Sequence, residues 1–479
     1  MSSTVELPFW FVLVAGILAL IGLVDRLLIP SVRWMLRRRV NEAIDELNAR
    51  LKLRIQPFKL TKRESLIDRI VYDADLVRAI EAHSAQTGEP RNVTLARVKD
   101  YAKEIVPSFN AWAYFKFGAH AARWLSNALY RVRLGYYDED KIKAIDPDAT
   151  VVFVINHRSN MDYVLVTYLA AASSALSYAV GEWARVMLLQ TLIRSMGAYF
   201  IRRDSSDPLY RKVLARYVQI ATAEGVTQAV FPEGGLTRDG ALRPARLGLL
   251  SYIVSRFDPN GARDVVFIPV GINYDRVIED RNLTASIAKE AGTPHQRRGA
   301  KAVARYLFEA LGMRLSGRWH KFGYASVSFG EPLSLKSYLD EASIDLRRLD
   351  EGQRFEETDK IAKALMVRIA KIVPVLPVPL IATIFEQAGG EALSHIDIKA
   401  RAQALVEELR ARGVYVHVPR QDLDYALEVG LRIMTMRHMI EEKDGLLSTN
   451  PREAVVIRYY SNSIAHHFTP HATAEKYEQ

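Results

Sequence analysis

Short apolar runs alternate with amphipathic stretches between about residues 150 and 331 of this 479-residue chain. Runs of this length predict buried strands, and apolar side chains three and four positions apart predict helices. The expected strands are Val151–Ile155, Tyr199–Arg202, Gln228–Phe231, Val265–Gly271 and Ala325–Phe329. The expected helices are Val164–Ala175, Pro208–Ala223, Leu247–Phe257 and Gly299–Leu315. This alternation predicts an α/β domain over residues 146–340, with a largely parallel twisted sheet flanked by helices.

The N-terminal segment predicts a membrane anchor over residues 1–30. Leu7–Val24 carries no charged residue and is long enough, with slight help from its flanks, to cross a bilayer. Basic residues follow it, at Arg26, Arg33, Arg37, Arg38 and Arg39. By the positive-inside rule the body of the protein is then cytoplasmic, as in a single-pass protein of the bacterial inner membrane. The alternative is a buried core helix.

The segments on either side of the α/β region are expected to be helical, over residues 31–145 and 341–479. Ala111–Tyr130 is rich in aromatic and basic side chains, which fits either a helix on a membrane surface or an aromatic stripe packed on a neighbouring helix. Ile372–Phe385 is apolar but short and interrupted by prolines, so it cannot span a bilayer. It either dips into the membrane interface or packs beneath the α/β domain. Ile396–Ala411 and Gln421–Glu442 are expected to be helices of a small bundle.

The charge of the chain indicates an anionic partner, because the net charge is +10. Nucleic acid, an anionic membrane and a phosphorylated substrate would each fit. The chain has no cysteine, which excludes disulfides, thiolate metal sites and a cysteine nucleophile. No metal is implied, and His466, His467 and His471 are expected to belong to a polar C-terminal tail.

One of the expected strands is followed by a histidine and an aspartate. Val151–Ile155 precedes His157 and Asp162, which are five positions apart. This spacing does not place two side chains on one face of a helix, so the chain must turn between them. Ser159 or Asn160 can cap a helix that starts within the motif. The geometry would be that of a base held by a carboxylate, although Ser159-x-x-Asp162 also fits a capping box that binds only backbone N–H groups.

Three further stretches place polar groups at the ends of expected strands, where ligands of parallel sheets bind. Gly197–Arg203 ends in two arginines, and a forked guanidinium suits a phosphate dianion. Phe231–Gly240 contains adjacent glycines, which allow the backbone to approach a ligand closely. Phe267–Asp275 is an apolar strand with a polar end. Each stretch alone also fits an ordinary strand end or turn.

Taken in order, these four stretches resemble the motifs of the glycerolipid acyltransferase family. The sequences HRSNMDY, GAYFIRR, EGGLTRDG and PVGINYDRVIED look most like those of the bacterial (PlsB-type) and mitochondrial glycerol-3-phosphate acyltransferases. The resemblance covers most of residues 75–467. One position departs from the pattern: the family usually has an arginine three positions after the glutamate, and Leu236 stands there.

The resemblance implies a membrane-anchored enzyme that transfers a fatty acyl group from an acyl thioester to glycerol 3-phosphate in phospholipid biosynthesis. His157 would be the general base and Asp162 would orient it. The expected substrate-binding residues are Arg202, Arg203, Glu233, Gly234, Gly235 and Arg238. No cofactor is implied beyond the co-substrate, acyl-CoA or acyl carrier protein, and no nucleic acid is implied as a partner.

Other interpretations stay open at this point. Lysophosphatidate or dihydroxyacetone phosphate could be the acceptor instead. A serine acyl-enzyme is formally possible, although direct transfer needs fewer groups. From another class, a catalytically inactive relative could serve as a basic module that binds membranes or nucleic acid.

Overall fold

The computed structural model describes residues 56–111, 113–170, 176–180, 194–202, 206–290 and 321–468. All of these belong to one compact unit, which begins at Ile55. The predicted anchor Leu7–Val24 and the predicted helix Gly299–Leu315 lie outside the described residues. Among those that are described, no helix is both long and apolar enough to cross a membrane.

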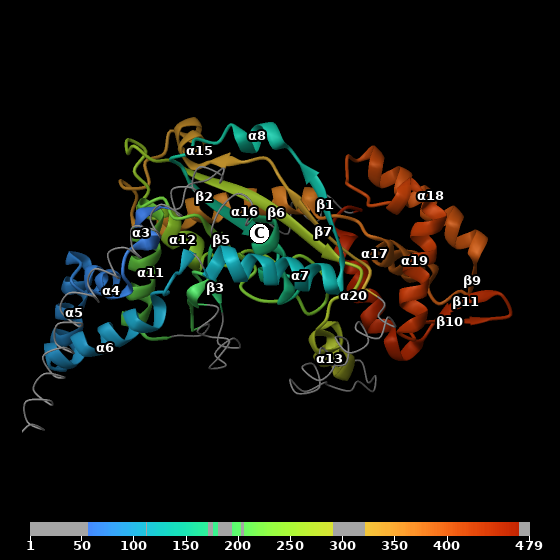
Figure 1. Ribbon diagram of the computed structural model, residues 1–479, viewed down its shortest axis with the longest axis horizontal. Helices are drawn as coiled ribbons and strands as arrows, with labels where there is room; N and C mark the ends of the chain where they lie inside the picture. Colours follow the sequence, from blue (N-terminus) through green and yellow to red (C-terminus); the bar gives the residue numbers. More distant parts are fainter. Residues whose placement is uncertain are drawn as a thin grey trace, which may run out of the picture. The chain divides into compact units, whose positions relative to one another are not determined.

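A mostly parallel sheet forms the centre of this unit (Figure 1). In the described residues it has eight strands, in the order β1-β7-β6-β2-β5-β3-β4, with β8 pairing β6. They are β1 (Arg131–Tyr137), β2 (Thr150–Ile155), β3 (Ser177–Val180), β4 (Tyr199–Phe200), β5 (Gln228–Val230), β6 (Val265–Tyr274), β7 (Tyr324–Phe329) and β8 (Leu333–Ser334). Within this sheet the pairings of β6 with β7 and with β8 are antiparallel and the others are parallel, so the predicted α/β class with a largely parallel sheet is confirmed.

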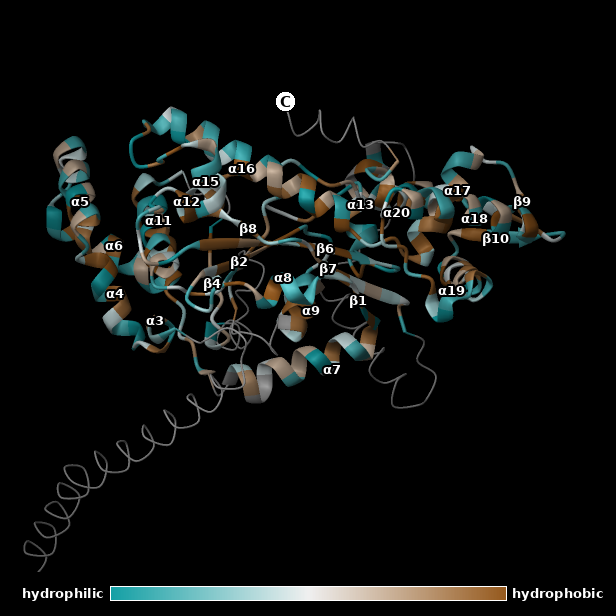
Figure 2. Ribbon diagram, turned by 90° about the horizontal axis from the view of Figure 1, so that it is seen from above, coloured by the Kyte–Doolittle hydropathy of each residue, from teal (hydrophilic) through white to brown (hydrophobic). Residues whose placement is uncertain are grey.

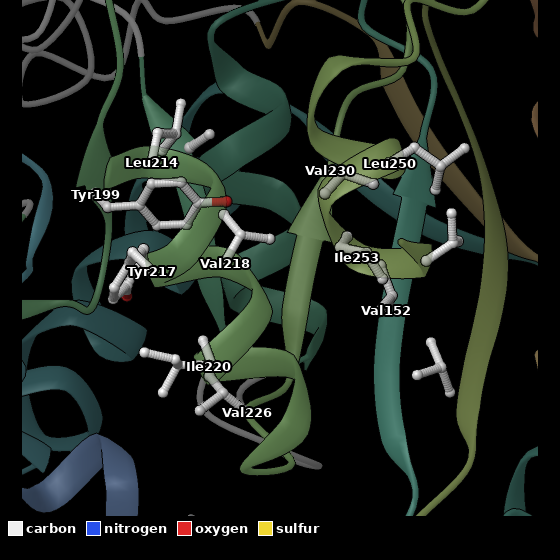
Figure 3. Packing of buried hydrophobic residues seen from close by; sticks show 14 of the residues in the cluster. Val152, Tyr199, Leu214, Tyr217, Val218, Ile220, Val226, Val230, Leu250 and Ile253 are labelled. Atoms are coloured by element: carbon white, nitrogen blue, oxygen red, sulfur yellow. The ribbon is translucent and has the colours of Figure 1, made fainter. Parts of the chain in front are cut away.

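The central strand β2 is buried on both faces, as the uninterrupted apolar run Val151–Ile155 predicts. Val152 and Val154 belong to the main core, which they share with α11 (Pro208–Ala223), α12 (Gly248–Val254) and α16 (Glu351–Ile372). Figure 3 shows Val152 next to Ile253 of α12, with Val230 of β5 and Leu250 of α12 farther along the same cluster. In Figure 2, α16 lies on one side of the sheet, and α7 (Ala119–Leu129) and α9 (Met161–Ala170) lie on the other. The sheet is therefore covered on both faces.

Helix α11 begins and ends where the sequence predicts. Asp207 accepts the backbone N–H groups of Leu209 (2.8 Å) and Tyr210 (3.4 Å), and Pro208 occupies the first turn. The N-terminal helices pack against α11. The helices that precede α7 in the described chain are α3 (Pro57–Leu60), α4 (Arg63–Val71), α5 (Ala74–Thr87), α6 (Arg91–Ile105) and η2 (Ala113–Gly118). A short helix, α8 (Glu139–Lys143), lies between β1 and β2.

The C-terminal part is mainly helical and packs against the sheet region. Helix α17 (Pro377–Ala388) is buried along most of its length and contacts α18, α19 and α20, so the packing alternative for Ile372–Phe385 is the one realised. The remaining elements are α13 (Asp280–Glu290), α15 (Leu335–Ala342), α18 (His395–Ala411), η4 (Pro419–Gln421), α19 (Leu423–Met436), η5 (Pro451–Glu453) and α20 (Ala454–Ala465). Strands β9 (Leu393–Ser394), β10 (Ile440–Lys443) and β11 (Leu446–Thr449) form a small antiparallel sheet.

Some expected boundaries differ from those observed. The sheet begins at β1, inside the segment predicted as helical through residue 145. The helix expected over Gln421–Glu442 ends at Met436 and is followed by β10. Within the aromatic segment, Tyr114 is fully buried whereas Trp124 is half exposed, at 51%. This segment therefore packs on the protein at one end and presents an aromatic ring to solvent at the other.

Candidate active site

The loop between β2 and α9 brings His157 and Asp162 together. Nδ1 of His157 lies 2.9 Å from Oδ2 of Asp162, and both side chains are buried. The same oxygen accepts the backbone N–H groups of Arg158 (2.7 Å) and Ser159 (3.0 Å). Oδ1 accepts the hydroxyl of Tyr274 (2.6 Å). Asp162 thus binds both the imidazole ring and the backbone of the loop, so the orienting and the capping interpretations hold together.

The second ring nitrogen of His157 is available for chemistry. Because Nδ1 donates to a carboxylate oxygen, the lone pair of the neutral ring is on Nε2. Nε2 is buried and has no hydrogen-bond partner among the described residues. The ring packs against Phe231, with centroids 4.3 Å apart, and lies on the wall of a cavity. An acceptor nitrogen held beside a cavity can take a proton from a bound hydroxyl group.

A second carboxylate fixes the same loop. Glu279 accepts the hydroxyl of Ser159 (2.8 Å) and the side-chain amide of Asn160 (3.1 Å). Its burial raises its pKa. Sequence reasoning gave no role to Glu279 or to Tyr274, which ends β6. The available signal was the polar end of an otherwise apolar strand.

The cavity beside His157 is large and positively charged. Its volume is about 610 Å³, and no acidic side chain is among its described lining residues. Five arginines line it: Arg202, Arg211, Arg238, Arg243 and Arg246. The guanidinium groups of Arg238, Arg243 and Arg246 form no hydrogen bond or ion pair in the described part of the chain. Unpaired guanidinium groups around a cavity are suited to a phosphate dianion.

Glu233 does not line the cavity but holds the loop Phe231–Gly240, called the glycine loop below. Its Oε1 accepts the backbone N–H of His157 (3.0 Å), and its Oε2 accepts that of Arg243 (3.2 Å). Burial raises the pKa of Glu233 to about 7. The next residue, Gly234, has a φ of +68°, and a Cβ atom there would come within 2.6 Å of Cδ of Arg246. Glu233 therefore joins the loop that carries His157 to the segment that carries Arg243. The sequence alone did not predict this link.

The two arginines predicted after β4 have different outcomes. Arg202 lines the cavity, but its guanidinium binds both oxygens of Glu104, at 3.0 and 2.7 Å. It is therefore largely committed to a partner within the protein. Arg203 lies outside the described residues. Leu236, where the family pattern has arginine, lines the cavity together with Gly235.

Helix α20, near the C-terminal end of the chain, contacts the loop between β2 and α9 that carries His157, called the histidine loop below. The side chain of Arg158 is 1% exposed and donates to the carbonyl oxygens of Ser463 (3.1 Å) and Gly240. Asn462 donates to the carbonyl oxygen of Asp239 at 2.9 Å. A Cβ atom on Gly240 would overlap the carbonyl oxygen of Tyr459, so this approach requires glycine. The helix thus contacts both the histidine loop and the glycine loop.

Two of the three C-terminal histidines are not in a polar tail, contrary to the prediction. His467 is buried, and its Nε2 lies 2.9 Å from the carbonyl oxygen of Val373. His466 follows the last residue of α20, and burial lowers the pKa of its ring. These rings are enclosed because α20 packs against α17. His471 lies outside the described residues.

Two regions of the chain match known protein families. Residues 133–273 match the acyltransferase family model, and residues 308–476 match that of the glycerol-3-phosphate acyltransferase C-terminal region. The resemblance to the glycerolipid acyltransferases is confirmed. The two matched regions contain, respectively, the candidate base His157 and the helix α20 that contacts its loop.

Individual relatives are named glycerol-3-phosphate acyltransferases. One from Aeromonas hydrophila is 26% identical over 422 residues, which cover 86% of this chain and 50% of the relative. One from Xylella fastidiosa is 28% identical over 436 residues, covering 86% and 48%. The chain therefore spans about half the length of these relatives. A solved 1-acyl-sn-glycerophosphate (LPA) acyltransferase from Thermotoga maritima is 17% identical, with a TM-score of 0.28. The match covers 62% of this chain and 95% of that enzyme.

Proposed function

We propose that this chain is a glycerol-3-phosphate acyltransferase, which transfers a fatty acyl group from an acyl thioester to glycerol 3-phosphate. One observation carries the proposal. The unpartnered Nε2 of His157 lies beside a cavity that is lined by five arginines and, among its described lining residues, by no acidic side chain. A base and a phosphate-binding surface in one cavity suit an acceptor that bears both a hydroxyl and a phosphate.

The transfer follows from the roles of these side chains. Nε2 of His157 takes the proton of the acceptor hydroxyl while its oxygen attacks the thioester carbonyl carbon. Asp162 keeps Nδ1 protonated and stabilises the imidazolium. The tetrahedral intermediate then collapses, the carbon–sulfur bond breaks, and the imidazolium returns its proton to the departing thiolate. The products are the fatty acyl ester of glycerol 3-phosphate and a free thiol.

Phosphate recognition is assigned mainly to the glycine loop and the segment after it. Arg238 is joined here by Arg243 and Arg246, which also have unpaired guanidinium groups. The backbone at Gly234 and Gly235 allows close approach of a ligand. Glu233, predicted as a direct ligand, would act through the backbone N–H groups that it holds. Arg202 and Arg203 are kept as secondary candidates.

We expect Arg238→Ala to raise the Michaelis constant for glycerol 3-phosphate more than that for the acyl donor. A small acceptor offers little apolar surface, so its phosphate supplies most of the binding. Loss of one charge-assisted contact, worth about 1.5–3 kcal/mol, corresponds to a rise of about 10- to 150-fold. Initial rates with each substrate varied in turn would measure it.

The reverse change provides the control. Leu236 lines the same cavity, so Leu236→Arg adds a guanidinium where relatives usually have one and should lower the same constant. Equal effects of Arg238→Ala on both Michaelis constants would instead place this arginine at the acyl donor.

The acceptor is tested by comparing substrates with one enzyme preparation. Glycerol 3-phosphate, dihydroxyacetone phosphate and lysophosphatidate would each be assayed with acyl-CoA and with acyl-acyl carrier protein. We expect the highest kcat/KM with glycerol 3-phosphate, because the unpaired arginines of this cavity can bind its phosphate, which supplies most of the binding of so small an acceptor. Preference for lysophosphatidate would overturn the acceptor assignment, and no turnover with any pair would favour the binding-module interpretation.

Membrane anchoring by residues 1–30 rests on the sequence. Leu7–Val24 is uncharged and is followed by a basic cluster, so we expect one span with the remainder of the chain in the cytoplasm. A reporter enzyme fused after Arg39 should be active only in the cytoplasm. Activity of a periplasmic reporter at this position would reverse the orientation.

A further inference from the structure

A second cavity lies where α19 meets the strands of the main sheet. Its volume is about 300 Å³, and it shares no described lining residue with the cavity of His157. Five of its lining residues are basic: Arg131, Arg276, Lys321, Arg432 and Arg437. None of the described lining residues is acidic. The cations come from β1, from the segments next to β6 and β7, and from α19, so several parts of the chain form this cavity together.

The carboxylates nearest to these cations are already engaged. Asp280 pairs with Arg437 at 2.5 Å and accepts the hydroxyl of Tyr460 at 2.5 Å. Asp275 accepts the backbone N–H groups of Tyr324 (2.7 Å) and Val378 (2.9 Å). These two carboxylates lie outside the described lining of the cavity, which has five cations and no acidic side chain.

Two of the arginines show how the cavity is built. Arg437 is buried, at 9% exposure, and its guanidinium also donates to Tyr460 (3.0 Å), so its position is fixed. Arg432, five residues earlier and within α19, is exposed and forms no hydrogen bond or ion pair with described residues. Its guanidinium is therefore available to an anion, where it would form charge-assisted hydrogen bonds.

The remaining wall is apolar. Val429, Ile433 and Met436 line the cavity from positions four and three residues apart, which lie on one face of α19. Phe322 lines it from the segment before β7. Met436 is 57% exposed, and a methionine adapts readily to an apolar ligand. Cations beside such a wall match an anion that carries an alkyl chain.

We propose that this cavity binds the phosphate headgroup of an acylated phosphate monoester, at a site separate from the catalytic cavity. The cations bind the phosphate, and the apolar face of α19 contacts the first methylenes of the acyl chain. This binding does not require acyl transfer, so it stands or fails independently of the proposed function.

The test is calorimetric titration of the full-length protein with lysophosphatidic acid below its critical micelle concentration. Arg432→Glu should weaken one component of this binding at least tenfold, because it places a carboxylate beside the phosphate. That component should persist in Arg238→Ala, which alters only the catalytic cavity. Arg410→Glu makes the same charge change at an exposed, unpaired arginine of α18 and should bind as the wild type does.

Three further probes define the ligand. Lysophosphatidylcholine with the same chain should bind this site at least tenfold more weakly, because it lacks the dianion. Glycerol 3-phosphate and inorganic phosphate should also bind it at least tenfold more weakly, because they lack the chain. Equal binding of inorganic phosphate would overturn the acylated ligand, and unchanged titrations of Arg432→Glu would overturn the site. Should that variant unfold at lower temperature, Arg432→Gln replaces it and must show a smaller loss in the same direction.

Discussion

Replacing His157 with alanine should lower the turnover number by roughly 10²–10⁴-fold, the usual contribution of a positioned general base. No other described side chain both lines the cavity and presents an imidazole nitrogen to it. The ring is buried against Phe231, so its removal leaves a space, but the arginines proposed to bind the phosphate are untouched. Rates at saturating substrate, together with a thermal unfolding curve, would measure the effect.

Asp162→Asn separates the orienting role from the capping role. An asparagine has similar volume, but its amide group cannot accept hydrogen bonds at both terminal atoms. Since Asp162 accepts from His157, from two backbone N–H groups and from Tyr274, both turnover and the unfolding temperature should fall. Near-normal turnover with a lower unfolding temperature would show that Asp162 serves only as a cap.

The sequence predicted those elements whose signals are local. Strand β2 contains the uninterrupted apolar run Val151–Ile155, and α11 has an aspartate cap followed by proline at its start. Strand β1 was missed because it contains Arg131, Arg133 and Gly135 and lies at the edge of the sheet, partly exposed. Its register with β7 links Arg131 to Tyr324, a pairing that no local pattern encodes.

The same distinction applies to the site. His157 and Asp162 were found because they lie five positions apart and the turn between them is predictable. The commitment of Arg202 to Glu104 and the position of Glu233 behind the loop depend on tertiary packing. The contact of Arg158 with Ser463 joins residues 305 positions apart. Sequence spacing can identify candidate reactive groups, but it does not reveal the distant groups that hold them.

Arg158→Met should therefore reduce both stability and turnover. Methionine fills much of the space of the buried arginine but donates no hydrogen bond, so the carbonyl oxygens of Gly240 and Ser463 lose their donor. Loss of hydrogen bonds to a charged group should lower the free energy of unfolding by about 1.5–3 kcal/mol. The backbone N–H of Arg158 binds Asp162, so a shift of this loop would also move His157. A displacement of about 1 Å can cost roughly 10²-fold in rate.

Ser463→Ala is the matched control for this variant. It removes the side-chain contact with Asn273 but keeps the carbonyl oxygen that binds Arg158, so kcat should stay within about twofold of the wild type while stability falls by about 0.5–1.5 kcal/mol. Both variants would be assayed well below their unfolding temperatures, so that loss of folded protein does not enter the rate. A normal kcat for Arg158→Met would show that α20 stabilises the fold without positioning the base. A reduced kcat with unchanged Michaelis constants, in Arg158→Met alone, is expected because the arginine contacts the loop that carries His157 and lies outside the substrate cavity.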